Sequence, residues 1–217
     1  LMPALFVGHG NPMNAIEDNA YSRAWQKVGT ELPDIQACVV ISAHWLTHGT
    51  HITDAPTQPI IYDMYGFPPE LYQVQYPAMG DPELAKLLQK QLLAYEAKLD
   101  STWGLDHGTW SVLTHMLPEP KVPVLQISID MRKNLSQLSD IFARLKALRE
   151  KGVLFIGSGN IVHNLRRLSF EPGVVFDWAV EFDAFAKENI LAHNIKRLAN
   201  ARGETESSRY AIEFDDH

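Results

Sequence analysis

Three histidines far apart in the sequence each lie at the end of a predicted strand or shortly after one. They are His9, His44 and His163. The carboxyl ends of parallel strands lie at one edge of a sheet, so we expect these imidazoles to converge there. Any one of them taken alone also fits a hydrogen-bonded loop histidine. Together, two or three neutral imidazoles with open coordination positions predict a catalytic zinc site or a non-haem Fe(II) site.

Glycines surround two of these histidines. Gly8 and Gly10 flank the first, and Gly157 and Gly159 precede the third. Glycine is favoured where the backbone takes a positive φ or must approach a ligand closely. A glycine-rich turn after a strand can also cradle a phosphate. The sequence, however, has no dinucleotide or Walker fingerprint and no G-x-S-x-G nucleophile motif, which weakens the nicotinamide and hydrolase interpretations.

A fourth histidine, His107, lies in a predicted loop between two helices. Because His107 does not follow a strand, we interpret it as a proton-transfer group rather than a metal ligand. An imidazole titrates near neutral pH, which suits acid–base catalysis. The alternative interpretation is a loop residue that caps the following helix.

The elements that must position these histidines alternate along the chain between short apolar runs and segments with helical spacing. The predicted strands are 3–7, 39–41, 123–129 and 153–156. The predicted helices are 15–32, 81–97, 112–116, 135–148 and 174–201. The long segment 47–80, with one short strand at 51–53, is expected to be a functional loop. This alternation predicts an α/β fold with a central, mostly parallel sheet covered by helices on both faces, in one domain, 1–217.

Composition restricts the class of partner and compartment. The chain of 217 residues carries a net charge of −7 and no run of Lys or Arg, which argues against nucleic acid as a partner. It shows no signal sequence and no apolar stretch long enough for a membrane helix. The single cysteine, Cys38, lies in an apolar run and is expected to be a buried thiol, which fits a reducing cytoplasm. No pattern indicates an oligomeric state.

Four motifs, taken in order, resemble the signature of the class III extradiol ring-cleaving dioxygenases, in particular the DOPA 4,5-dioxygenase branch. They are Gly8–Met13 (GHGNPM), Ser42–Trp45 (SAHW), Leu105–Trp110 (LDHGTW) and Gly157–Leu165 (GSGNIVHNL). The resemblance extends from Pro3 to about Leu168. It implies an oxidoreductase that uses one divalent metal per chain, with Fe(II) expected for catalysis and Zn(II) also able to bind. The partners it implies are a small catechol and O2, with a DOPA-like ring opened to a semialdehyde of the 4,5-seco-DOPA type.

The resemblance also assigns roles to the histidines. It implies that His9 and His44 are metal ligands and that His163 is a further ligand or the adjacent acid–base group. It places His107 in the substrate site, so that His107 and His163 are the candidate catalytic residues. Members of the family continue into a C-terminal segment with a Thr-Pro-x-His-type motif that supplies one more metal-site residue. We expect that segment to be missing here, and His217 is a weak substitute.

Two other functions use the same histidines. A zinc hydrolase would use them to lower the pKa of a metal-bound water. A non-catalytic protein would bind or carry the metal without turning over a catechol. Oxygen consumption distinguishes these functions, because neither a zinc hydrolase nor a carrier consumes O2.

Overall fold

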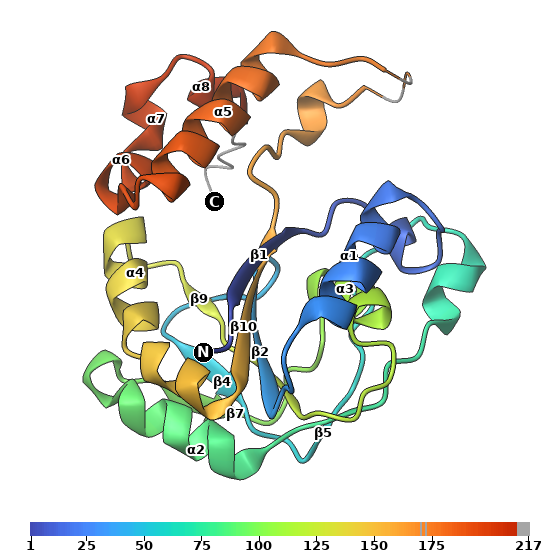
Figure 1. Cartoon of the computed structure of the whole chain (residues 1–217), viewed down its shortest axis with the longest axis vertical. Coiled ribbons are helices and arrows are strands. Elements are labelled where there is room, and N and C mark those ends of the chain that lie inside the picture. The colour runs from blue at the N-terminus through green and yellow to red at the C-terminus, as the bar shows by residue number, and fades with distance from the viewer. Residues whose placement is uncertain (170, 172, 212–217) are drawn as a thin grey trace. The chain divides into compact units, whose positions relative to one another are not determined.

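The computed structural model describes residues 1–169, 171 and 173–211 of the chain. The contacts within the chain divide it into two compact units, and Figure 1 labels many of their helices and strands. Unit 1 comprises Leu1–Arg132 and Asp140–Gly159, and unit 2 comprises Lys133–Ser139 and the residues from Asn160 onward. The predicted domain range of 1–217 stays a prediction.

A four-stranded sheet forms the centre of unit 1. In spatial order its strands are β1 (Ala4–Gly8), β10 (Val153–Gly159), β2 (Ala37–Ser42) and β8 (Val124–Gln126). All neighbouring pairs in this sheet are parallel. Cys38, Val39 and Val40 on the inner strand β2 are at most 1% exposed, as expected for a strand covered on both faces. The predicted α/β class with a parallel central sheet is confirmed.

Shorter strands pair outside the central sheet. β3 (Leu46–Thr47) pairs with β9 (Ile129–Asp130), β4 (His51–Thr53) with β7 (Lys98–Asp100), and β5 (Thr57–Gln58) with β6 (Ala78–Met79). The strand expected at 51–53 is therefore present. The rest of segment 47–80 is more ordered than a plain loop, because β5 and β6 pair and a 3-10 helix, η2 (Pro69–Gln73), lies between them.

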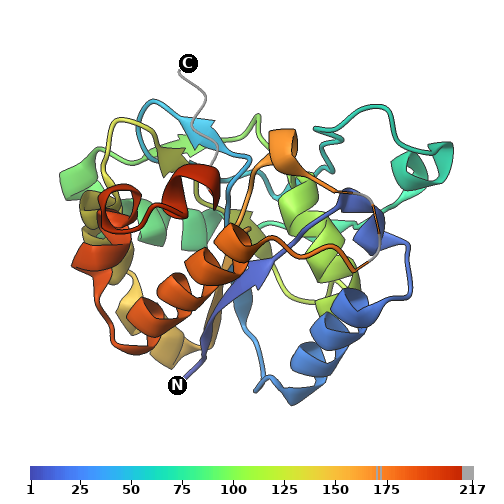
Figure 2. The ribbon, with the colours of Figure 1, turned by 90° about the horizontal axis from the view of Figure 1, so that it is seen from above.

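Helices lie on both sides of the sheet in unit 1, with α1 and α3 on one side and α2 on the other (Figures 1 and 2). The helices of unit 1 are η1 (Pro12–Ala15), α1 (Ala20–Glu31), α2 (Pro82–Gln91), η3 (Leu93–Tyr95), α3 (His107–Met116) and η4 (Lys146–Lys151). The residues of α4 (Leu135–Ala143) are divided between the two units. The backbones of α1 and α3 approach closely at Gly29, where an added Cβ would lie 1.9 Å from the carbonyl oxygen of Met116. Only glycine fits this contact.

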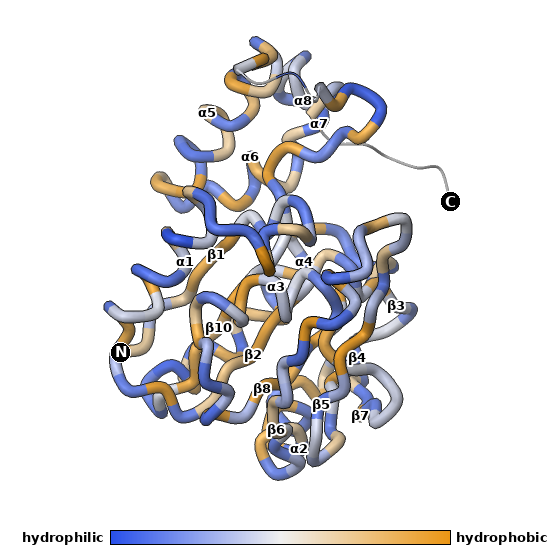
Figure 3. Tube along the Cα trace, turned by 90° about the vertical axis from the view of Figure 1, so that its right-hand side faces the viewer, coloured by the Kyte–Doolittle hydropathy of each residue, from blue (hydrophilic) through white to orange (hydrophobic). Residues whose placement is uncertain are grey.

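The main hydrophobic core lies between the sheet and the helices α1 and α3. It includes Trp25, Val40, Trp110, Leu113 and Leu154. Figure 3 shows apolar residues concentrated along the inner strand β2 and the neighbouring edge strand β8. The predicted buried thiol belongs to the same core, and burial raises its pKa to about 12. Within the described ranges, no helix is both long and apolar enough to cross a membrane.

Unit 2 contains one helix of 15 residues and several short helices after the end of β10. They are η5 (Leu165–Arg167), α5 (Asp177–Leu191), α6 (Ile195–Ala199), α7 (Ala201–Glu204) and α8 (Ser208–Ala211). The prediction of one helix over 174–201 is wrong in its continuity. His193 has a φ of 52°, and the Asn194 side chain accepts a hydrogen bond from the backbone N–H of Arg197 at the start of α6. A left-handed residue followed by an N-cap ends one helix and begins another.

Candidate active site

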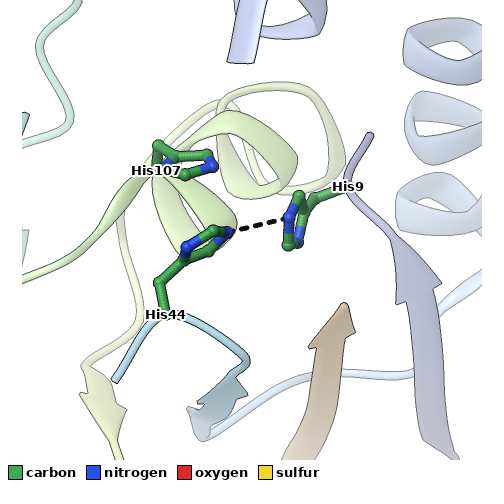
Figure 4. A group of neighbouring side chains, drawn as sticks. All are labelled: His9, His44 and His107. Carbon is green, nitrogen blue, oxygen red and sulfur yellow. Dashed lines mark hydrogen bonds between the residues drawn. The ribbon is translucent and has the colours of Figure 1, made fainter. Parts of the chain in front are cut away.

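Three histidines meet at the carboxyl end of the central sheet (Figure 4). His9 comes directly after β1, His44 comes two residues after β2, and His107 is the first residue of α3. The possible ligand nitrogens of these side chains all lie within 4.8 Å of one another. No second group of this kind occurs in the described part of the chain. Parallel strands bring His9 and His44 to the same edge, and α3 brings His107 to them.

The hydrogen bonds of His9 fix which of its ring nitrogens carries the proton. Nδ1 of His9 lies 2.9 Å from Oγ of Ser158. Ser158 donates its single hydroxyl hydrogen to the carbonyl oxygen of Gly108, so it accepts a hydrogen bond from His9. Nδ1 of His9 therefore carries the proton, and Nε2 of the neutral ring presents its lone pair to the cluster.

Nε2 of His44 donates a hydrogen bond to Nε2 of His9 across 3.0 Å (Figure 4), and a metal ion held by both nitrogens would take the place of this proton. A metal–imidazole bond is about 2.0–2.1 Å long, so two imidazole nitrogens at right angles around one ion are about 3.0 Å apart. Neutral imidazole suits zinc, iron, copper and nickel. The spacing and the donor type of this pair therefore fit one divalent metal ion.

His107 is held from behind by Asp63. One carboxylate oxygen of Asp63 accepts the backbone N–H of His107 at 2.8 Å, and the other lies 2.9 Å from its Nδ1. Burial by itself raises the pKa of Asp63, but the hydrogen bond and the charge of His107 bring it below the usual value. An ionised carboxylate only accepts hydrogen bonds, so Nδ1 of His107 carries a proton and Nε2 is its free base position.

Two serines attach the start of α3 to the ends of neighbouring strands. Ser42 on β2 and Ser158 on β10 are partners in the register of the sheet. Ser42 donates to Oδ1 of Asp106 at 2.7 Å and accepts the backbone N–H of His44 at 3.2 Å. Ser158 donates to the carbonyl oxygen of Gly108. The residues before and after His107, Asp106 and Gly108, are thus bonded to β2 and β10. His44 follows β2, and His9 contacts Ser158 on β10.

Asp106 extends this attachment to β8. Its side chain accepts a hydrogen bond from Nε2 of Gln126 at 2.8 Å, and its backbone N–H donates to Oε1 of the same residue. Asp106 is fully buried, and this burial raises its pKa, against the opposing effect of the hydrogen bonds from Gln126 and Ser42. Asp106 therefore fixes the start of α3 to the strands β2 and β8.

Replacement of Ser158 by alanine should weaken metal binding without unfolding the protein. The change removes the acceptor that keeps the proton on Nδ1 of His9. Removal of a hydrogen bond behind a metal ligand typically costs 10- to 100-fold in affinity, and we expect about tenfold here. A competitive zinc titration measures it, with Ser101→Ala as the control because Ser101 is exposed. Equal zinc affinity in the two variants would contradict the role of Ser158.

His107 lies at the start of a helix and not in a loop as expected. Its role in proton transfer stays a prediction. The helix starts here because the carbonyl oxygen of Asp106 accepts the first helical hydrogen bonds, from Thr109 and Trp110. His107 therefore lies beside His9 and His44, with ring centroids 5.4 and 3.9 Å away, respectively.

His163 belongs to unit 2, where its backbone N–H donates to the carbonyl oxygen of Ala211 at 2.7 Å. Its predicted place at the metal, as a ligand or an acid–base group, stays a prediction. His217, named as a weak substitute ligand, lies outside the described residues. Of the glycines near the histidines, Gly10 has the positive φ expected, at 61°.

Sequence reasoning missed Asp63. Asp63 lies in the segment 47–80, among Pro, Gly and Tyr residues, and nothing in its spacing relates it to His107. Ser42 belongs to the SAHW motif and Ser158 to the GSGNIVHNL motif. Their hydrogen bonds to the start of α3 depend on the register of β2 and β10, which the motifs do not specify. The only usable signal was the presence of hydroxyl residues at the ends of two predicted strands.

Residues 4–216 match the family model described as the catalytic LigB subunit of aromatic ring-opening dioxygenase. The chain belongs to this family. The resemblance to class III extradiol dioxygenases is thereby confirmed, and membership in the LigB family makes this chain a ring-opening oxidoreductase. Dioxygenases of the LigB family use a metal, and the three-histidine cluster can hold one.

Relatives and one solved structure agree with this assignment. The chain is 46% identical over 191 residues to 4,5-DOPA dioxygenase extradiol of Escherichia coli K12, covering 87% of this chain and 70% of that protein. It is 37% identical over 188 residues to the protein of the same name from Beta vulgaris, covering 83% and 69%, respectively. A crystal structure of an uncharacterized protein from Escherichia coli K12 matches with a TM-score of 0.81 and 39% identity, over 97% of this chain and 82% of that one.

Proposed function

We propose that the chain opens the ring of a DOPA-like catechol with O2, giving a semialdehyde of the 4,5-seco-DOPA type. The family assignment supports ring opening, and the names of the relatives from Escherichia coli and Beta vulgaris support DOPA as the substrate class. Both atoms of O2 enter the product, so no further reductant is needed. The zinc hydrolase and the carrier are disfavoured, because neither opens an aromatic ring.

We assign Fe(II) as the catalytic metal and His9 and His44 as its ligands. The observation that carries this assignment is the 3.0 Å spacing of their Nε2 atoms. Zn(II) fits the same nitrogens and is expected to bind without supporting the reaction, since it has no redox chemistry. His163 remains in the proposal as the further ligand or acid–base group that its motif implies.

His107 is assigned as the base. Its Nδ1 is held by an ionised carboxylate and its Nε2 faces the cluster, which is the geometry of a base with an orienting partner. Nε2 takes a proton from a catechol hydroxyl, and the imidazolium that forms is stabilised by the charge of Asp63. The same Nε2 returns the proton as the ring opens. A bound Fe(II) would supply the redox chemistry by which O2 reacts with the ring.

The proposed function also specifies the binding partners of the protein, and the cellular location is proposed separately. The partners are a small catechol and O2, and the oligomeric state stays open. A cytoplasmic location is proposed on the buried position of the single cysteine, Cys38.

Oxygen uptake tests the proposed function. The protein is loaded anaerobically with Fe(II) or with Zn(II), then mixed with aerated DOPA. We expect uptake of O2 with a yellow ring-opened product in the iron-loaded sample and none in the zinc-loaded sample. Hydroquinone is the substrate control, because its two hydroxyls are not adjacent and it is not a catechol.

The same experiment can contradict the proposal. Absence of O2 uptake with DOPA and with other catechols would reject ring opening by this chain. Equal uptake in the zinc-loaded sample would reject the assignment of a redox-active metal. Uptake with hydroquinone at the rate seen for DOPA would reject a catechol as the substrate class.

A further inference from the structure

We infer that Asp63 is the positioning residue for the base, because it fixes His107 in the tautomer whose Nε2 can take a proton. This inference rests on the proposed role of His107. The side chain of Asp63 is only 16% exposed, and both of its carboxylate oxygens are engaged by His107, one by the backbone N–H and one by Nδ1. Two contacts from one carboxylate fix the ring's position as well as its proton.

The segment that carries Asp63 is attached to the segment that carries His107. The backbone N–H of Ile61 donates to the carbonyl oxygen of Leu105 at 2.7 Å. The indole N–H of Trp110 donates to the carbonyl oxygen of Ile61 at 3.0 Å. These two bonds lie on either side of His107 in sequence. The backbone next to Asp63 is therefore fixed relative to the start of α3 and is not part of an unattached loop.

Further contacts keep this segment in place. The hydroxyl of Tyr62 donates to the carbonyl oxygen of Val74 at 2.6 Å, and the ring of Tyr62 packs edge-on against Trp110 with centroids 6.0 Å apart. The two residues that precede Asp63 are therefore both anchored. Because this backbone is already anchored, only the side-chain torsions of Asp63 remain to be fixed when it orients the ring of His107. This low entropy cost favours a single tautomer.

The charge of Asp63 also reaches a proposed metal ligand. Oδ2 of Asp63 lies 3.9 Å from Nδ1 of His44, beyond hydrogen-bond distance but close enough for attraction. This negative charge favours a proton on Nδ1 of His107, with which Asp63 makes its hydrogen bond. One carboxylate thus lies beside both the proposed base and a proposed ligand. Outer partners of this type fix the tautomer of a histidine in many metal sites.

An amide in place of the carboxylate should reverse the tautomer. In Asp63→Asn the side-chain carbonyl oxygen still accepts the hydrogen bond from the backbone N–H of His107. The NH2 group then faces Nδ1 and donates to it, so the proton of the imidazole moves to Nε2. Nε2 can no longer accept the catechol proton. The isosteric variant therefore tests the tautomer, because the shape of the side chain is unchanged.

The experiment compares the wild type, Asp63→Asn and Asp81→Asn. Asp81 caps α2, where asparagine caps equally well, so this control carries the same chemical change at a harmless position. We expect kcat of the iron-loaded Asp63→Asn variant to fall about 10- to 100-fold with little change in KM. Long-range ¹H–¹⁵N NMR of the zinc-loaded protein should show His107 protonated at Nδ1 in the wild type and at Nε2 in Asp63→Asn.

The tautomer and the rate give separable outcomes. A His107 ring still protonated at Nδ1 in Asp63→Asn overturns the inference, whatever happens to kcat. If the wild type takes up no O2, the proposed function fails, yet the NMR result still supports or overturns the positioning role of Asp63. If Asp63→Asn does not fold, Asp63→Glu replaces it. This variant keeps a carboxylate and should keep the proton on Nδ1, and a proton on Nε2 would overturn the inference.

Discussion

Alanine in place of His44 should remove the bound metal and O2 uptake together, whereas alanine in place of His107 should keep the metal and lose turnover. His44 contributes one of the two nitrogens that lie 3.0 Å apart. Its loss should weaken metal binding more than about 100-fold, beyond the usual 10- to 100-fold effect of an outer partner. His107 contributes proton transfer, whose loss typically costs about 10²- to 10⁴-fold in rate.

Metal content after dialysis and the rate of O2 uptake measure this contrast. His48→Ala is the matched control, because His48 is an exposed histidine four residues from His44. It should keep both metal and activity. Full metal content in the His44 variant would reject His44 as a ligand. Loss of metal from the His107 variant would show instead that His107 is a third ligand, in line with its place in the cluster.

Alanine in place of Gly108 should disable the site by displacing its attachments. A Cβ at this position would lie 2.7 Å from Oγ of Ser42, 3.1 Å from Cδ2 of His44 and 3.2 Å from Oδ1 of Asp106. Ser42 must then rotate away from Asp106, and the ring of His44 must shift. A displacement near 1 Å at a catalytic group can cost about 100-fold in rate, and we expect at least that loss.

The same substitution should lower stability moderately. Overpacking of a buried position costs about 1–3 kcal/mol. For a chain of this size each kcal/mol shifts Tm by about 2–4 °C, so Tm should fall by about 2–12 °C. Thermal unfolding and O2 uptake are measured on the same samples, with Gly203→Ala as the control. An added Cβ at Gly203 meets no atom within 4 Å. Wild-type activity in the Gly108 variant would show that the contacts at the start of α3 do not set the site.

Most of the framework of unit 1 was predictable from local patterns. Continuous apolar runs such as Val39–Ile41 predict strands buried on both faces, and β2 and β10 lie where these runs are. Helix boundaries were less predictable, because a break such as that at His193 depends on one residue with a positive φ in an otherwise helical pattern. The short pairing of β5 with β6 also has no strong sequence signal.

The positions of the histidines after predicted parallel strands were enough to predict which edge of the sheet carries the chemistry. His9 and His44 follow parallel strands, and parallel strands end together, so their meeting needed no structure. The groups that surround these two histidines could be identified only from the folded chain. Asp63 reaches His107 across 44 positions, and Ser158 reaches His9 across 149. Such contacts depend on how segments pack and on strand register. Local sequence does not encode packing or register. These contacts nevertheless determine which ring nitrogen of His9 and of His107 carries the proton.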